Sequence, residues 1–302
     1  MKPADLARLL SLAAIWGASF LFIRMLVPEI GALPTAFLRV LLSAVGLAAI
    51  LVFLRSNWAF RGKLGKTLVI GIVSSGVPAA MYALAAKVLP AGYSAIFNAT
   101  TPLMGVLIGA LFFSEKLTGA KAAGVLMGLA GVAVLTRTGP VAFDLQLLWG
   151  AAACLVATTC YGFAGFMTKR WITEAGGMDS GLVAFGCQIG ATLCLLPVFA
   201  WDAPAMPLTP LLEPGTWLAL AALGFLCTSF AYILYFRLIA NVGPVKTMTV
   251  TFLIPPFGVF WGVLLLDESV SMAHLQGGVL IALALWLVLK PAGVPAAAKS
   301  AG

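Results

Sequence analysis

The side chains that could do chemistry in this chain are aromatic, hydroxyl and amide groups set inside long apolar stretches. Such groups can wall an apolar pocket and give it a few hydrogen-bonding points, which suits a neutral or zwitterionic organic solute with a planar part. They supply no nucleophile–base pair or metal-ligand cluster, so we expect no enzymatic activity and no cofactor. The predicted substrate-binding residues are Trp16, Ser19, Phe20, Tyr82, Asn98, Thr101, Tyr161, Tyr232 and Thr251.

The composition indicates that lipid surrounds these groups. Hydrophobic residues make up 62% of the chain and charged residues 9%, whereas soluble domains hold roughly 45–50% and 25%. The charges are separated by apolar stretches of about 20 residues, the length that a helix needs to cross a bilayer. We predict ten spans, at residues 6–26, 33–54, 66–87, 91–113, 119–136, 147–170, 180–199, 215–238, 243–266 and 272–290.

The basic residues predict how the spans are oriented. If the N-terminus is cytoplasmic, most Lys and Arg residues fall at cytoplasmic ends and loops, while Arg24, Lys87 and Arg137 fall at outer ends. Because basic residues favour the cytoplasmic side, we predict an inner-membrane protein with both termini in the cytoplasm. The net charge of +8 then requires no nucleic acid. The expected partners are a small-molecule substrate and the lipid bilayer, with the chain a monomer or a weak dimer.

Two halves of the chain match each other. Four residues in or just after the fourth span recur 153 positions later in or just after the ninth, which is five spans further along the chain. An odd number of spans per repeat gives the halves opposite orientations in the bilayer, as in many secondary transporters. We therefore predict an all-α membrane protein of ten transmembrane helices in two inverted five-helix repeats, at residues 1–138 and 146–302, joined by 139–145. The matched sets are Pro102, Gly105, Gly109 and Glu115, and Pro255, Gly258, Gly262 and Glu268.

Further matches involve the aromatic residues. Trp16-Gly17 in the first span corresponds to Tyr161-Gly162 in the sixth, and Tyr82 in the third span corresponds to Tyr232 in the eighth. A single aromatic residue in a membrane helix often serves packing or an interfacial belt. Repetition at equivalent places favours a shared pocket between the halves.

Several segments of the sequence resemble a known family. WGASFLFIRML, PTAFLRVLL, TTPLMGVLIGALFFSEKLTGAKAAGVLMGLAGVAVL and IPPFGVFWGVLLLDESVSMAHLQGGVLIALAL are similar to the EamA-type drug/metabolite transporters, and within them to the aromatic amino-acid exporter group. The resemblance implies ten helices in inverted repeats and export of small metabolites. The second motif departs from the first, because Ser269 follows Glu268 where a basic residue, Lys116, follows Glu115.

The paired prolines are candidate gate hinges. Pro102 and Pro255 cannot donate a backbone hydrogen bond, which frees the carbonyls of Asn98 and Thr251. These carbonyls could line a cavity, or neighbouring polar groups could satisfy them.

Basic residues at the span ends could also take part in gating. Arg24, Lys87, Lys169 and Arg237 could attract a carboxylate or close a gate, or simply complement helix C-termini and snorkel to the interface. Arg39, inside the second span, needs a partner: a backbone carbonyl, Glu29 or the substrate.

The titratable groups near span ends have predicted structural roles. We expect Glu115 and Glu268 to cap the helix that follows each of them, and His274 to lie on the surface at the interface. With no acid or His in the membrane interior, we predict transport without obligatory proton coupling.

The sequence thus predicts a secondary exporter of small organic metabolites, favouring neutral or aromatic amino acids and working by alternating access. A multidrug or nucleotide-sugar-type transporter of the same superfamily is the alternative. A lipophilic cation favours a midplane carboxylate, and a sugar nucleotide favours several midplane cations; the sequence offers neither.

Overall fold

The computed structural model describes residues 2–115, 117–138, 144–242 and 250–289. Most of the predicted linker and the C-terminal tail lie outside this part. In the described residues every regular element is a helix, which confirms the all-helical class. The first half contains α1 (Pro3–Ile30), α2 (Ala32–Phe53), α3 (Leu64–Gly71), η1 (Ile72–Gly76), α4 (Val77–Ala85), α5 (Ala91–Asn98), α6 (Thr101–Phe112) and α7 (Gly119–Thr138). The second half contains α8 (Leu145–Thr168), η2 (Lys169–Thr173), α9 (Ser180–Asp202), η3 (Ala203–Ala205), η4 (Thr209–Leu212), α10 (Pro214–Ala221), η5 (Ala222–Phe230), α11 (Ala231–Val242), α13 (Val250–Leu266) and α14 (Met272–Leu289).

Length and hydropathy make this a multi-pass membrane protein. Among the described residues, seven helical stretches are long and apolar enough to cross a bilayer, and each coincides with a predicted span. Three shorter apolar helices fall at the other predicted spans, and for them the membrane crossing remains a prediction. The seven are Pro3–Ile30, Ala32–Phe53, Leu64–Ala85, Ala91–Phe112, Leu145–Thr173, Ser180–Ala205 and Pro214–Tyr235; the three are Gly119–Leu135, Leu253–Leu266 and Met272–Ala284.

The two matched prolines sit in different local structures. Pro102 lies in the first turn of α6, directly after the break that ends α5 at Asn98. A proline suits a first helical turn because an N–H there has no acceptor within its own helix. Pro255 instead lies inside the continuous helix α13, beside Pro256. The symmetry of the sequence is therefore not repeated in the backbone at these positions.

Helical irregularities do recur in the third and eighth predicted spans. The π-helical segment η1 begins at Ile72 and η5 begins at Ala222, 150 residues later. Tyr82 and Tyr232 have the same separation. π-Helical turns are rare and often occur at functional sites. Their positions before Tyr82 and Tyr232 therefore favour the predicted substrate pocket as the functional region.

Glycines allow close backbone contacts between the halves. A Cβ atom added at Gly17 of α1 would lie 2.9 Å from the backbone nitrogen of Gly258 on α13. One added at Gly162 of α8 would lie 3.2 Å from Cα of Gly105 on α6. Gly17 corresponds to Gly162 and Gly105 to Gly258 in the sequence repeat, so the two crossings are equivalent. Each needs glycine because any side chain would separate the backbones.

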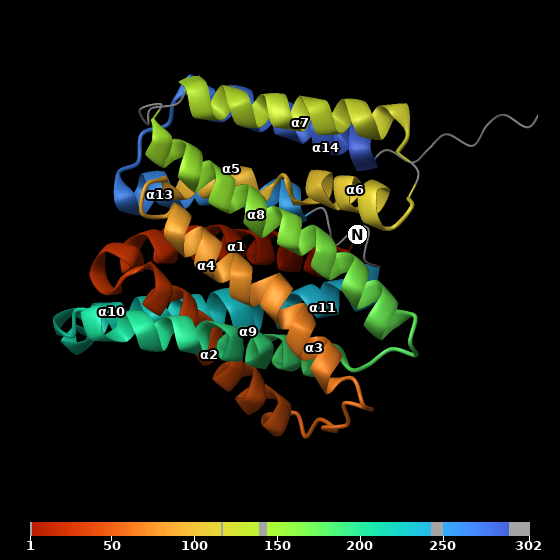
Figure 1. Ribbon diagram of the computed structural model, residues 1–302, viewed down its shortest axis with the longest axis vertical. Coiled ribbons are helices and arrows are strands. Elements are labelled where there is room, and N and C mark those ends of the chain that lie inside the picture. The colour runs from red at the N-terminus through yellow and green to blue at the C-terminus, as the bar shows by residue number, and fades with distance from the viewer. Residues whose placement is uncertain (1, 116, 139–143, 243–249, 290–302) are drawn as a thin grey trace, which may run out of the picture.

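Helices α7 and α14 pack side by side along one edge of the molecule (Figure 1). Their crossing also rests on small residues: a Cβ atom added at Gly131 would lie 2.9 Å from the carbonyl oxygen of Gly277. At the opposite edge, α2 packs against α9. The helices that hold the aromatic residues of the predicted site lie between these two edges (Figure 1).

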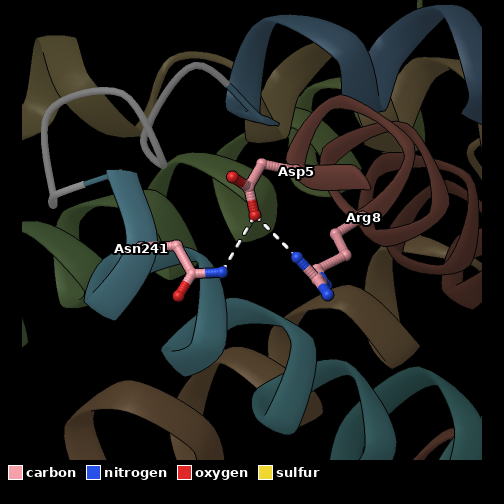
Figure 2. Close-up of polar contacts among 3 residues, drawn as sticks. All are labelled: Asp5, Arg8 and Asn241. Atoms are coloured by element: carbon pink, nitrogen blue, oxygen red, sulfur yellow. Dashed lines mark hydrogen bonds and ion pairs between the residues drawn. The ribbon is translucent and has the colours of Figure 1, made fainter. Parts of the chain in front are cut away.

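A polar contact joins the start of α1 to the end of α11 (Figure 2). Asp5 is buried, and its Oδ1 accepts hydrogen bonds from Arg8 at 2.7 Å and from Asn241 Nδ2 at 2.9 Å. Two donors on one carboxylate oxygen offset the cost of burying its charge. The contact therefore ties residues that are 236 positions apart in the sequence.

Candidate functional site

Three predicted aromatic residues meet between the helices of the two halves. The ring of Phe20 on α1 meets Tyr82 on α4 edge to face, with 5.3 Å between centroids. Tyr82 in turn lies 6.4 Å from Tyr161 on α8, with 27° between the ring planes. Aromatic pairs at these distances attract each other beyond simple burial. The structure thus brings together residues that the sequence singled out on three separate spans.

Polar groups from α5 and α6 border this cluster. The Tyr82 hydroxyl donates to Asn98 Oδ1 at 3.0 Å, and the Thr101 hydroxyl donates to the Asn98 backbone carbonyl at 2.7 Å. That carbonyl is the acceptor which Pro102 leaves without a helical donor. A neighbouring hydroxyl therefore satisfies it, as one of the two sequence interpretations allowed, and Thr101 has a structural bond beside the pocket.

Trp16 lies one helical turn before Phe20 on α1, and Ser19 directly precedes Phe20. The half-buried indole of Trp16 contacts Tyr235 of α11, with centroids 5.4 Å apart. The buried Ser19 hydroxyl donates to the Trp16 carbonyl at 2.5 Å, so it bonds within its own helix. Tyr235 was not among the predicted residues, although its spacing of three from Tyr232 would have placed both on one helix face.

A second polar cluster joins α2, η1, α9 and η5. Arg39 Nε donates to the Thr228 hydroxyl at 3.3 Å, and Gln188 Nε2 donates to the Ser75 hydroxyl at 3.0 Å. Ser75 also hydrogen-bonds to the predicted residue Tyr232. Sequence reasoning missed Ser75, Gln188 and Thr228, although a scan for polar residues inside apolar spans would have found them.

The structure gives the partner of Arg39, which the sequence did not determine, and the position of Thr251. The partner of Arg39 is Thr228 of η5, rather than Glu29, which is exposed. This interaction brings a cation of the first half against the second half. Thr251 lies half-buried on α13, within the helix that crosses α1 at Gly17.

The four predicted gating cations have different environments. Arg24 donates to the carbonyl of Ala86, at the C-terminal end of α4, where a cation complements the helix dipole. Lys169 lies 4.0 Å from Glu174, but both side chains are more than half exposed, so this pair stabilises little. Lys87 and Arg237 are exposed.

Glu268 caps a helix other than the one predicted. Its carboxylate accepts hydrogen bonds from the backbone N–H groups of Ala91 at 2.7 Å and Gly92 at 3.2 Å, at the start of α5. The expectation that Glu268 caps the next helix, α14, is therefore wrong. It reaches a helix of the other half because the turn after α13 directs its side chain toward the start of α5.

Glu115 has the same local turn with a different outcome. The backbone N–H of Glu115 donates to Gly109, as that of Glu268 donates to Gly262. Its side chain, however, is exposed and forms no hydrogen bond with any residue that the structure describes. The predicted cap of the following helix is therefore not formed by Glu115 either.

His274 is also placed differently from the expectation. It is buried, with 8% of its surface exposed, and its ring lies 5.0 Å from that of Tyr93 on α5. Its Nδ1 accepts from the backbone N–H of Ser271 at 3.2 Å. The prediction of a surface histidine is wrong, because α5 covers the start of α14.

Two cavities lie beside the predicted pocket rather than within it. One of about 360 Å³ runs between α5, α13 and α14 and is lined by Pro255 and His274. The other, of about 230 Å³, is lined by Lys87 and Asp202 near the start of α2. The aromatic cluster lines neither cavity. Its rings instead contact one another, so a solute that entered there would have to separate them.

Comparisons with known proteins identify the family. The model of the EamA-like transporter family matches residues 6–137 and 148–290. The chain belongs to this family. A crystal structure with 21% identity shares the fold, with a TM-score of 0.62 over 95% of this chain and 98% of that chain.

Curated relatives of this EamA-like chain are also transporters. The uncharacterized transporter YoaV of Bacillus subtilis is 22% identical, over 92% of this chain and 94% of that protein. A probable terminal-alkyne amino-acid exporter of Streptantibioticus cattleyicolor is 25% identical, over 64% of this chain and 62% of that protein. The resemblance to the EamA-type family is therefore confirmed, and this protein is a membrane transporter.

Proposed function

We propose that this transporter exports neutral and aromatic amino acids by alternating access. The observation that carries the proposal is the cluster of Phe20, Tyr82 and Tyr161, with the Tyr82–Asn98 hydrogen bond at its border. Aromatic walls with few polar atoms fit a planar apolar group joined to a small polar one. The name of the Streptantibioticus relative, an amino-acid exporter, supports the same substrate class.

The proposed architecture is ten helices in two inverted five-helix repeats. The equivalent glycine crossings, Gly17 with Gly258 and Gly162 with Gly105, support it. So does the packing, since α1 contacts α13 as α8 contacts α6, and α2 contacts η5 as α9 contacts η1. In this arrangement both termini are cytoplasmic, in an inner membrane, and the chain acts as a monomer or weak dimer.

Contacts between the halves at both faces fit alternating access. In the proposed topology, Glu268 holds the start of α5 at the outer face, and Asp5 holds Asn241 at the cytoplasmic face. A carrier of this kind opens one face at a time, so each contact breaks in one part of the cycle. Pro102, at the α5–α6 break, is the proposed hinge in the first half, and Pro255 is its proposed counterpart.

We further propose that no proton is obligatory in the cycle. The acidic side chains cluster at helix ends and loops, away from the aromatic cluster. A coupling proton would need a titratable group whose charge biases one gate. Transport then follows the gradient of the solute or exchanges one solute for another.

The test is solute counterflow in proteoliposomes. Vesicles loaded with L-phenylalanine, L-leucine, a lipophilic cation or a sugar nucleotide should drive uptake of labelled phenylalanine only for the amino acids. Exchange with the cation or the sugar nucleotide, and none with amino acids, would favour the alternative substrate classes.

A tryptophan variant tests whether the aromatic residues recognise the solute. Trp16→Ala should slow phenylalanine exchange about tenfold while slowing leucine exchange less, because a large planar surface is lost. Trp149→Ala is the matched control, since Trp149 is 69% exposed on α8, away from the cluster. Equal slowing of both amino acids by Trp16→Ala would show that Trp16 supports packing only.

A further inference from the structure

Arg39 is a membrane-embedded cation without a counter-ion. It lies in the first half of α2, one of the helices long enough to span the membrane, and is half-buried. All ten acidic residues lie in the part of the chain that the structure describes, and none of them pairs with Arg39. A guanidinium has five N–H donors, and among the described residues one of them has a hydrogen-bond acceptor, the Thr228 hydroxyl. An ion so placed favours an anionic partner, and the described residues supply none.

The charge of Arg39 reaches the predicted pocket. Its charge acts on the hydroxyl groups of Tyr82, Tyr161 and Tyr232, which come from α4, α8 and α11. The first two belong to the aromatic cluster. A group bound by Arg39 would therefore have its apolar part next to those rings.

Gln188 supplies a second, independent observation. The side chain is fully buried, with 0% of its surface exposed, and its Oε1 has no hydrogen-bond partner among the described residues. A buried acceptor without a partner costs free energy that a ligand donor would recover. Ser75 connects Gln188 to Tyr232, and Tyr232 lies one helical turn from Thr228, the partner of Arg39.

We propose that Arg39 binds the carboxylate of the transported solute and that Gln188 Oε1 accepts a hydrogen bond from its ammonium group. The inference rests on the proposed function and assigns the zwitterionic head of the substrate to the polar cluster of α2, η1, α9 and η5. The guanidinium matches a carboxylate with two parallel hydrogen bonds. The side chain of the solute then extends toward Phe20, Tyr82 and Tyr161.

Binding of three ligands distinguishes the role of Arg39 from that of Gln188. Purified protein in detergent is titrated calorimetrically with L-phenylalanine, with 3-phenylpropionate, which lacks the amine, and with phenethylamine, which lacks the carboxylate. Arg39→Gln should weaken binding of the two carboxylates about tenfold to a hundredfold and leave phenethylamine unchanged. Gln188→Met should weaken phenylalanine and phenethylamine but leave 3-phenylpropionate unchanged. Arg61→Gln, at an exposed loop position, is the matched control and should bind all three like the wild type.

Each result decides the inference. A folded Arg39→Gln variant that keeps the wild-type preference for carboxylates would overturn the role of Arg39, even if the wild type transports amino acids. Failure of the wild type to bind any of the three ligands would count against the proposed function itself. If Arg39→Gln does not fold, Arg39→Lys keeps the charge but loses the planar fork. It should weaken both carboxylates relative to phenethylamine, and an unchanged ratio would again refute the role.

Discussion

Replacing Glu268 by Gln should loosen the start of α5. The carboxylate holds two backbone N–H groups, at 2.7 and 3.2 Å. A hydrogen bond to a charged group contributes about 1.5–3 kcal/mol, against about 0.5–1.5 kcal/mol for a neutral one. The negative charge at a helix N-terminus adds about 0.3–1 kcal/mol. Gln keeps the shape but loses the charge and one acceptor, so we expect the local contact to weaken by about 1–3 kcal/mol.

Hydrogen exchange of the Ala91 and Gly92 amides measures this loss directly. A weakening of 1–3 kcal/mol corresponds to exchange about 5–150 times faster when local opening controls the rate. Glu115→Gln is the matched control, because Glu115 has the same turn but no described hydrogen bond from its side chain. Unchanged exchange at Ala91 and Gly92 in a folded Glu268→Gln variant would refute the assignment of Glu268 as the contact that holds this end of α5.

Three more predictions test the hinge, the pocket and the energy source. Pro102→Ala restores an N–H that can bond to the Asn98 carbonyl, so it should slow counterflow several-fold while leaving the melting temperature within a few degrees of the wild type. The control variant Pro197→Ala, in the interior of α9, should transport at the wild-type rate. A wild-type rate for Pro102→Ala as well would show that Pro102 serves packing only. Tyr82→Phe removes the hydroxyl bonded to Asn98 and should lower the free energy of unfolding by about 0.5–1.5 kcal/mol in a denaturant titration, and no change would mean that this hydrogen bond adds no net stability. Vesicles loaded with phenylalanine should empty at similar rates with or without an imposed pH gradient; accumulation driven by that gradient would contradict the absence of proton coupling and direct attention to Glu268 and His274.

The sequence predicted the positions of the helices well because these depend on local composition. Apolar stretches of bilayer length identify spans without knowledge of their neighbours. The sequence repeat matched Gly17 with Gly162 and Gly105 with Gly258, and in the structure these glycines lie at equivalent crossings. The matched aromatic residues predicted a shared pocket, and two of them, Tyr82 and Tyr161, have ring centroids 6.4 Å apart.

Side-chain partners could not be predicted in the same way, because they depend on how helices from the two halves pack. The Glu268 carboxylate could be assigned to a helix N-terminus from its type and position, but its target, α5, lies more than 170 residues earlier in the chain. His274 was misplaced for the same reason, since α5 covers it. Gln188 gave no signal in the motif search because it belongs to no repeated pair.

The two halves agree where backbones cross and differ where the proposed substrate binds. The glycine crossings are duplicated, and in the proposed alternating-access cycle both gates need the same close helix packing. At the polar cluster, Ala36-Phe37 and Ala184-Phe185 align the second and seventh predicted spans and set Arg39 against Cys187. An amino acid has one carboxylate, so it cannot pair with two identical cations related by a pseudo-twofold axis. A carrier with symmetric gates therefore still needs an asymmetric binding site. A single cation on one side and a single unpaired acceptor on the other allow a zwitterion to bind in one orientation only. The double variant Arg39→Gln, Gln188→Arg, which exchanges the two side chains, should therefore not recover the phenylalanine binding that Arg39→Gln loses.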